Sequence, residues 1–296
     1  MPVPSAAVGV PVEVITHEVT ARWLMAYAAA LDDYNPAYLD TRRPGGVVGH
    51  PLFPVCVEWD SMLAARRLPL YEAVLSADEA RRGVHATHDS VVHRLVRAGD
   101  VLTTHAEVVG VEARKPGVYT VLRETTVDAA GEVVCVTDNG SLYLGVELDG
   151  PARPAPPLAP PAPGPPSGAA PVHERRVSIA RGAAHTYTEC AQIWNPIHTD
   201  IAVAEAAALP ELILHGTATL AHGVTTVVDE ACGGDPALVR RVSARFTAMV
   251  LMPSTITVRL YDRVEAGDGV GVPFEVLTEN GERAISAGFV GLNSPS

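Results

Sequence analysis

Residues 187–200 read YTECAQIWNPIHTD, and residues 27–40 read YAAALDDYNPAYLD. The two stretches align without a gap when the chain is shifted by 160 residues. The matched pairs are Tyr27 with Tyr187, Tyr34 with Trp194, Asn35 with Asn195, Pro36 with Pro196, and Asp40 with Asp200. A shift of 165 residues also places His50 on His215. Rare features repeated in one order indicate an internal duplication, so the two halves should share a fold.

A proline-rich stretch, GPARPAPPLAPPAPGPPSGAAP, separates the halves at residues 150–171. Serial prolines cannot donate to helix or sheet ladders and favour an extended, semi-rigid chain. We expect an exposed, poorly ordered spacer that is dispensable for stability; a proline-rich ligand for another domain is the alternative. The predicted divisions are a first repeat at 1–149, a linker at 150–171 and a second repeat at 172–296.

Each half is expected to contain helices followed by strands. A helix at 20–32 should end at the turn of Asn35 and Pro36, because a residue before proline avoids the helical region. Longer central helices are expected at 51–67 and 216–232. Strand-like runs rich in Val and Thr follow at 85–95, 100–112, 117–129 and 132–146, and at 242–250, 255–263, 269–279 and 282–292. A helix leading into antiparallel strands predicts an α+β fold.

Composition narrows the classes of function. The 296 residues are 47% hydrophobic with a formal charge of −12, which argues for a buried core and against nucleic acid or anionic membranes as partners. The four cysteines form no CxxC pair, and no secretory signal or membrane-length apolar run is present, so we predict a soluble cytoplasmic protein. His85, His88 and His93 alternate without accompanying carboxylates, so we expect solvated histidines and no metal site.

Residues 194–200 and 214–217, WNPIHTD and LHGT, form the densest chemical constellation. A rigid Asn-Pro turn holds His198 in one orientation, which a general base needs. Gly216 lies where a helix starts, and its backbone N–H can stabilise an oxyanion. A base beside an oxyanion donor suits proton transfer next to a carbonyl. A histidine after such a turn also serves as a local cap, and the residues alone leave both interpretations open.

The stretches WNPIHTD and LILHGTATL, at 194–200 and 212–220, resemble the signature of the MaoC-like, (R)-specific enoyl-CoA hydratases. The resemblance implies a hotdog fold, an antiparallel sheet wrapped around one helix, and for the duplicated chain a double hotdog. It implies an acyl-thioester hydratase or dehydratase that interconverts 2-enoyl and 3-hydroxyacyl groups on coenzyme A or a carrier protein. No metal or redox cofactor is implied, and a homodimer is left open.

Residue by residue, the resemblance makes His198 the catalytic acid/base, Asn195 the residue that orients the site, and Gly216 the oxyanion donor. The flanking residues proposed to bind substrate are Trp194, Ile193, His215 and Arg245. Arg245 lies in a strand where an arginine could meet the phosphates of coenzyme A or of a carrier-protein arm. An exposed surface arginine is the equal alternative.

The sequence departs from the family pattern at one catalytic position. The family carries Asp two residues before the Asn, and this chain carries Ile193. The first half has Asp33 at that position but Tyr38 in place of the histidine, and we expect Asp33 not to contact His198. The departure keeps two alternatives open: another proton transfer on the same scaffold, such as double-bond isomerisation or intramolecular addition, or a hotdog that binds acyl groups without catalysis.

Overall fold

The computed structural model describes residues 2–74, 76, 82–267 and 269–293, and both halves follow one plan. The first half contains β1 (Val3–Pro4), β2 (Ile15–Glu18), α1 (Ala21–Ala30), α2 (Pro36–Leu39), α3 (Pro54–Arg66), α4 (Pro69–Glu72), β3 (Gly83–Val92), β4 (Val101–Arg114), β5 (Gly117–Val127), β6 (Val133–Leu144) and β7 (Leu148–Asp149). The second half contains β8 (His173–Ile179), α6 (Ala183–Ala191), η2 (Pro196–His198), α7 (Ile201–Ala206), α8 (Gly216–Ala231), η3 (Pro236–Leu238), β9 (Val239–Phe246), β10 (Ser254–Leu260), β11 (Val264–Ala266), β12 (Gly269–Leu277) and β13 (Arg283–Leu292).

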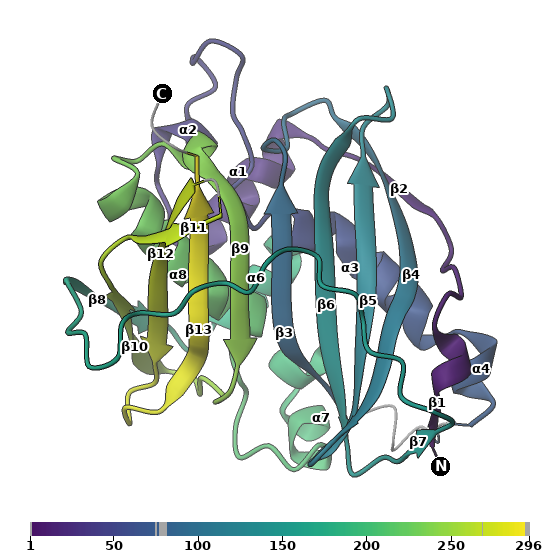
Figure 1. Cartoon of the computed structure of the whole chain (residues 1–296). Coiled ribbons are helices and arrows are strands. Elements are labelled where there is room, and N and C mark those ends of the chain that lie inside the picture. The colour runs from purple at the N-terminus through teal and green to yellow at the C-terminus, as the bar shows by residue number, and fades with distance from the viewer. Residues whose placement is uncertain (1, 75, 77–81, 268, 294–296) are drawn as a thin grey trace.

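Most strands of both halves form one continuous sheet (Figure 1), and β1 and β7 form a separate two-stranded sheet. Their order across the described chain is β2-β4-β5-β6-β3-β9-β13-β12-β10-β8, so the second half mirrors the first about the β3–β9 junction. There the two strands pair antiparallel, from Thr87 opposite Arg245 to Val91 opposite Arg241. The predicted α+β double hotdog is confirmed, with the two half-sheets joined side by side.

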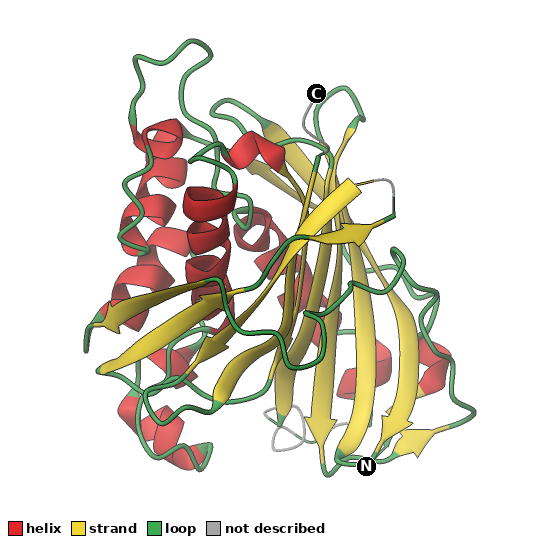
Figure 2. Cartoon of the chain, turned by 60° about the vertical axis from the view of Figure 1, so that its left-hand side comes forward, coloured by secondary structure: helices red, strands yellow, loops and turns green. Residues whose placement is uncertain are grey.

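The helices and the linker lie on opposite faces of this sheet. In Figure 1 the central helices α3 and α8 lie behind the strands, and the linker crosses in front of them. Figure 2, turned by 60°, shows the main helices gathered on one side of the strands. The apolar core lies between helices and sheet, because each strand turns alternate side chains toward the helices. No helix in the described residues is long and apolar enough to cross a membrane.

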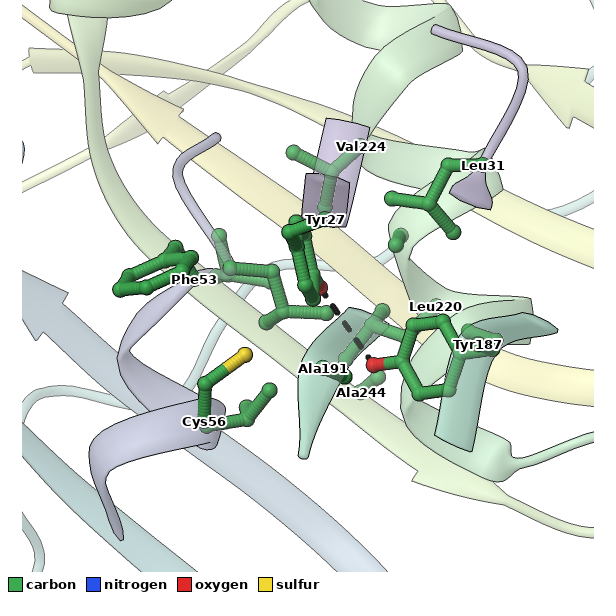
Figure 3. Packing of buried hydrophobic residues seen from close by; sticks show 14 of the residues in the cluster. Tyr27, Leu31, Phe53, Cys56, Tyr187, Ala191, Leu220, Val224 and Ala244 are labelled. Atoms are coloured by element: carbon green, nitrogen blue, oxygen red, sulfur yellow. Dashed lines mark hydrogen bonds between the residues drawn. The ribbon is translucent and has the colours of Figure 1, made fainter. Parts of the chain in front are cut away.

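Two equivalent tyrosines meet where the halves face each other. Helices α1 and α6 pack together, and the hydroxyls of Tyr27 and Tyr187 lie 3.5 Å apart (Figure 3). Tyr187 also donates to Thr217 Oγ1 at 3.0 Å, and the ring of Phe53 packs edge-on against Tyr27. Equivalent residues of two repeats related by a twofold axis meet where they lie close to that axis, so this pair marks the pseudo-twofold axis of the duplication.

The linker makes contacts that its composition does not predict. Val111 and Arg153 exchange two backbone hydrogen bonds of 2.8 Å at the start of the crossing. Farther along, Arg123 donates to the carbonyl of Pro156 at 2.8 Å, and Arg241 donates to that of Pro160 at 2.6 Å. Proline lacks an N–H but keeps its carbonyl, which is the group used here. The linker is thus exposed over most of its length, as expected, but it is bonded to the outer face of the sheet at three points. That it is dispensable for stability stays a prediction.

Arg241 joins three parts of the molecule, and its loss should be costly. Besides Pro160, it binds the carboxylate of Asp89 on β3 through two hydrogen bonds of 2.7 and 2.8 Å. Arg241→Leu should lower the free energy of unfolding by about 1.5–3 kcal/mol, measured by urea denaturation, because these are charged hydrogen bonds in a half-buried setting. Arg240→Leu is the matched control, since Arg240 bonds only to nearby backbone carbonyls. Equal losses in both variants would contradict a special role for the junction.

Candidate active site

His198 ends a short 3-10 turn that Asn195 caps. The Asn195 side-chain oxygen accepts from the N–H of Ile197, so the amide orders the turn that carries the histidine. The His198 side chain is buried, and its Nδ1 lies 2.9 Å from the carbonyl oxygen of Ile213. A carbonyl only accepts, so Nδ1 carries the proton and Nε2 is the basic nitrogen. This is the tautomer that a general base needs.

His215 lies against His198 and connects it to the central helix. The two imidazoles stack with centroids 3.7 Å apart and planes 26° apart, and His215 Nε2 lies 3.1 Å from Thr188 Oγ1. Burial lowers the pKa of His198 to about 4. Burial, and then the nearby His198, lowers the pKa of His215 well below its usual value. Both rings are therefore neutral at pH 7.

Gly216 begins α8 directly after His215, so the start of the helix lies beside the base. The first N–H groups of an α-helix have no acceptor within the helix and carry its positive dipole end. A Cβ at Gly216 would lie 3.1 Å from two ring carbons of Phe246, so packing favours glycine here as well. The structure thus places the neutral imidazole of His198, which stacks on His215, near the N-terminal end of a helix, where backbone donors could stabilise a developing oxyanion.

The remaining residues of the predicted site lie in different surroundings. Ile193 is buried within the apolar core, and no carboxylate replaces it. Trp194 is 54% exposed. Arg245 is exposed, and it lies on the opposite face of β9 from buried Ala244, the face that the linker crosses. The structure therefore does not bring Arg245 to His198.

Asp33, the first-half counterpart of Ile193, takes part in a separate buried chain of hydrogen bonds. The backbone N–H of Leu52 donates to His50 Nδ1 at 3.1 Å, which leaves the proton on Nε2. That Nε2 lies 3.2 Å from Thr225 Oγ1, and the threonine hydroxyl donates to Asp33 Oδ2 at 2.8 Å. Thr225 belongs to α8, so the chain links the two halves. Among the hydrogen bonds of the described residues none joins Asp33 to His198, as predicted.

Tyr38 occupies the position equivalent to His198 and offers no base. It is fully buried, its ring lies 5.5 Å from that of His50, and its hydroxyl has no hydrogen-bond partner among the described residues. Burial raises the pKa of this hydroxyl well above its usual value. The first half therefore keeps the carboxylate without the base, and the second keeps the base without the carboxylate.

The histidines of β3 differ from the expectation of solvated side chains. His93 is exposed, but His88 is buried and His85 is half-buried, and burial lowers their pKa values to about 4 and about 3. Within the described ranges, no group of three His, Cys, Asp or Glu residues is arranged to hold a metal ion.

Comparisons with known proteins match each half separately. The MaoC like domain family matches residues 164–270, and the FAS1-like, dehydratase domain region family matches residues 6–137. The peroxisomal enoyl-CoA hydratase 2 of Arabidopsis thaliana is 28% identical over 103 residues, covering 35% of this chain and 32% of the plant protein. The peroxisomal multifunctional enzyme type 2 of Drosophila melanogaster is 34% identical over 101 residues, covering 34% of this chain and 16% of the fly protein. The matched segments thus span a third or less of each relative.

Solved structures match over nearly the whole chain. A MaoC-like dehydratase from Phytophthora capsici superposes with a TM-score of 0.81 at 18% identity, covering 98% of each chain. A Mycobacterium tuberculosis protein described as a double hotdog fold superposes with a TM-score of 0.61 at 17% identity, covering 95% of this chain and 94% of that one. The chain therefore has the double hotdog fold, and its second half matches the MaoC like domain family.

In this double hotdog fold, sequence reasoning missed the hydrogen-bond partners of the two stacked histidines, the Ile213 carbonyl at His198 and Thr188 at His215. Thr188 directly follows Tyr187, one of the residues repeated in both halves. Its position next to a repeated residue is the signal that could have pointed to it. The carbonyl of Ile213 carries no side-chain signal. Thr225 reaches Asp33 across the boundary of the halves, a contact that only the relative placement of the two hotdogs creates.

Thr225 tests how firmly the two hotdogs depend on the Asp33 chain. Thr225→Val removes the hydroxyl between His50 and a buried carboxylate, and the free energy of unfolding should fall by about 1–3 kcal/mol because the carboxylate loses a partner. Thr226→Val on the same helix is the control, because its hydroxyl bonds only to the His222 carbonyl one turn earlier. Urea denaturation measures both. A Thr225→Val variant as stable as the control would contradict the structural role of the chain.

The neutral histidines predict acid sensitivity. Burial lowers the pKa values from 6.5 to about 3 or 4 at His50, His85, His88, His198 and His222, and it lowers the pKa of His215 well below its usual value. Below pH 6.5 the unfolded chain binds protons that the folded chain refuses, so stability is full above pH 6.5 and falls toward pH 4, by about 1.4 kcal/mol per pH unit for each net proton.

Two buried carboxyls oppose this trend without reversing it. Burial raises the pKa of Glu58 to about 7 and that of Glu124 well above its usual value, so the folded chain holds their protons where the unfolded chain releases them. Because the histidines with lowered pKa values outnumber these two carboxyls, the net effect is a loss of stability as the pH falls. Denaturation at pH 7.5, 6 and 5 should show a steep loss of stability, and a flat profile would contradict neutral burial of the histidines.

Proposed function

We propose that this MaoC-like protein hydrates 2-enoyl thioesters, or dehydrates 3-hydroxyacyl thioesters in the reverse direction, with His198 as its acid/base. The observation that carries the proposal is the hydrogen bond from His198 Nδ1 to the Ile213 carbonyl, which leaves a neutral, basic Nε2 beside the start of α8. The name of the Arabidopsis relative, enoyl-CoA hydratase 2, supports the same reaction class.

In the proposed reaction, Nε2 of His198 takes a proton from water as the water oxygen bonds to C3 of the enoyl group. The C2–C3 π electrons shift toward the carbonyl, and the Gly216 N–H stabilises the thioester enolate. The imidazolium then returns its proton to C2, which restores the carbonyl and the neutral histidine. One group thus acts as base and then as acid.

Ile193 favours a second candidate on the same scaffold. Its side chain lies in the apolar core, so it supplies no polar group to hold water beside His198. A double-bond shift or an intramolecular addition needs the same proton transfers without a bound water. We keep this reaction as the alternative, together with acyl binding without catalysis.

The thioester carrier of the substrate, the cellular location of the protein and its oligomeric state are further parts of the proposal. We propose a thioester of coenzyme A or of a carrier protein, since both present the same pantetheine arm. A cytoplasmic location and a homodimer remain predictions, and both curated relatives carry the word peroxisomal in their names.

His198 and Ile193 together test the proposal. His198→Ala should lower kcat for hydration of an enoyl pantetheine thioester about 10²- to 10⁴-fold, because a positioned acid/base contributes that much. His173→Ala on β8 is the control, because it removes a histidine that pairs with Glu230 and has no role in the proposed reaction. Ile193→Asp should raise kcat if a carboxylate helps to hold water, and Ile193→Asn separates the effect of charge from that of polarity.

Mass spectrometry of the products distinguishes the candidates. Hydration adds one water to the acyl mass, whereas isomerisation and intramolecular addition leave the mass unchanged. A product of unchanged mass that disappears in His198→Ala would support the second candidate. Turnover that survives in His198→Ala would contradict both catalytic proposals.

A further inference from the structure

The interior of the first hotdog is polar where that of the second is apolar. The inward, buried side chains of the first half-sheet include His88, Ser90, Thr104, Thr120, Glu124, Thr126, Thr137 and Asn139. Their counterparts in the second half-sheet include Val242, Ala244, Ile256, Val258, Val272, Phe274 and Val276. The inward side chains of both half-sheets face a central helix in the same fold. Because the second half folds with apolar side chains at these positions, the fold itself does not require polar ones.

Helix α3 adds polar groups to this interior. Glu58 and Ser61 are both fully buried on α3. Thr137 donates to Glu58 Oε1 at 2.7 Å, and Asn139 donates to Glu124 Oε2. The polar cluster is defined here as Glu58, Ser61, His88, Glu124 and Asn139.

Several atoms of the polar cluster have no partner in the protein. Glu58 Oε2, Ser61 Oγ and Glu124 Oε1 are buried without a hydrogen bond to any described residue. Unpaired buried polar groups cost folding free energy and are rare in native proteins. So many in one place indicate that hydrogen-bonding groups from outside the chain satisfy them.

The polar cluster begins beside the candidate active site. The Phe246 ring lies against Gly216 at the start of α8. The same ring packs against His85 with centroids 4.5 Å apart, and His85 lies 6.0 Å from His88. A thioester with its carbonyl at Gly216 would therefore have its acyl chain within reach of the cluster.

The protonation of the two carboxyls favours neutral ligand groups over cations. Burial raises the pKa of Glu58 to about 7, and burial together with the charge of Glu58 raises that of Glu124 well above its usual value. A carboxyl that keeps its proton both donates and accepts, as do serine and neutral histidine. A hydroxyl group, which also donates and accepts, complements all of these partners.

We propose that the first hotdog binds the acyl chain of the substrate through the polar cluster, and that this chain carries hydroxyl groups. The placement of the thioester rests on the proposed function. The polar cluster then sets specificity, since a site built to bond a hydroxyl discriminates against an alkyl chain that leaves its groups unpaired.

Binding of unreactive saturated thioesters tests this proposal separately from catalysis. The probes are octanoyl pantetheine and ω-hydroxyoctanoyl pantetheine thioesters, with Kd measured by calorimetry. The wild-type protein should bind the hydroxylated chain about 10- to 100-fold more tightly, because the plain chain leaves buried polar groups without partners. Equal Kd values, or no binding of either probe, would overturn the proposal.

Variants assign the preference to the polar cluster. Glu58→Met with Glu124→Met should abolish the preference, and replacement of buried ionisable groups by apolar ones is often tolerated in folding. Ser61→Ala is the milder variant and should reduce the preference severalfold. Glu275→Met removes a buried glutamate that pairs with Arg283 on the second half-sheet, and it should keep the preference. A preference unchanged in both cluster variants would overturn the proposal.

Hydration of a 2-octenoyl pantetheine thioester, measured in parallel, distinguishes the proposal of a polar subsite from the proposal of hydratase activity. Hydration by the wild-type protein without any hydroxyl preference in binding would overturn the polar subsite and leave the hydratase standing. A clear binding preference without hydration would support the subsite and contradict the hydratase.

Discussion

The backbone pairing of β3 with β9 fixes how the two hotdogs face each other. Each half-sheet alone would end in an edge strand with unpaired N–H and C=O groups, and the pairing satisfies both edges at once. The same pairing brings α1 and α6 together at Tyr27 and Tyr187. It also carries Thr225 of α8 to Asp33 of the other half. The buried contacts between the halves therefore depend on this one register.

Duplication gave the two halves one fold, and their interiors then diverged. The second hotdog surrounds α8 with apolar side chains, which stabilises it by burial and holds the start of that helix in place. The first has, between α3 and its strands, polar groups that gain little from burial alone, such as Glu58 and Glu124. Local violations of good packing tend to occur where function requires them. The first half thus shows the kind of interior that a binding role retains.

The repeat, the central helices with four strands after each, and the place of His198 were predictable, because side-chain identity and spacing carry those signals. The strands β2 and β8, which precede α1 and α6, were not among the expected elements. The Asn-Pro turn fixed the end of α1 and the start of the turn at His198. The face of β3 was not predictable, since alternation marks a strand but polarity suggested that His88 was outside when it is inside. The roles of the Ile213 and Pro160 carbonyls were not predictable for another reason. Every residue carries the same backbone acceptor, so only the folded chain shows which side chain each carbonyl contacts.

The surroundings of His198 restrict the reactions that it can run. Its Nδ1 meets a neutral carbonyl and its neighbour is a second neutral imidazole, so among the described residues no carboxylate is bonded to His198 to stabilise a charged ring. Burial further disfavours the charged ring. In the proposed reaction, a proton that Nε2 takes up must therefore pass back to the substrate within the same catalytic cycle, because the buried site does not stabilise a charged histidine. Additions across a double bond and double-bond shifts meet this condition because each gives back the proton it takes. Reactions that leave a lasting charge on the histidine do not, and the missing carboxylate at Ile193 makes that restriction stricter here.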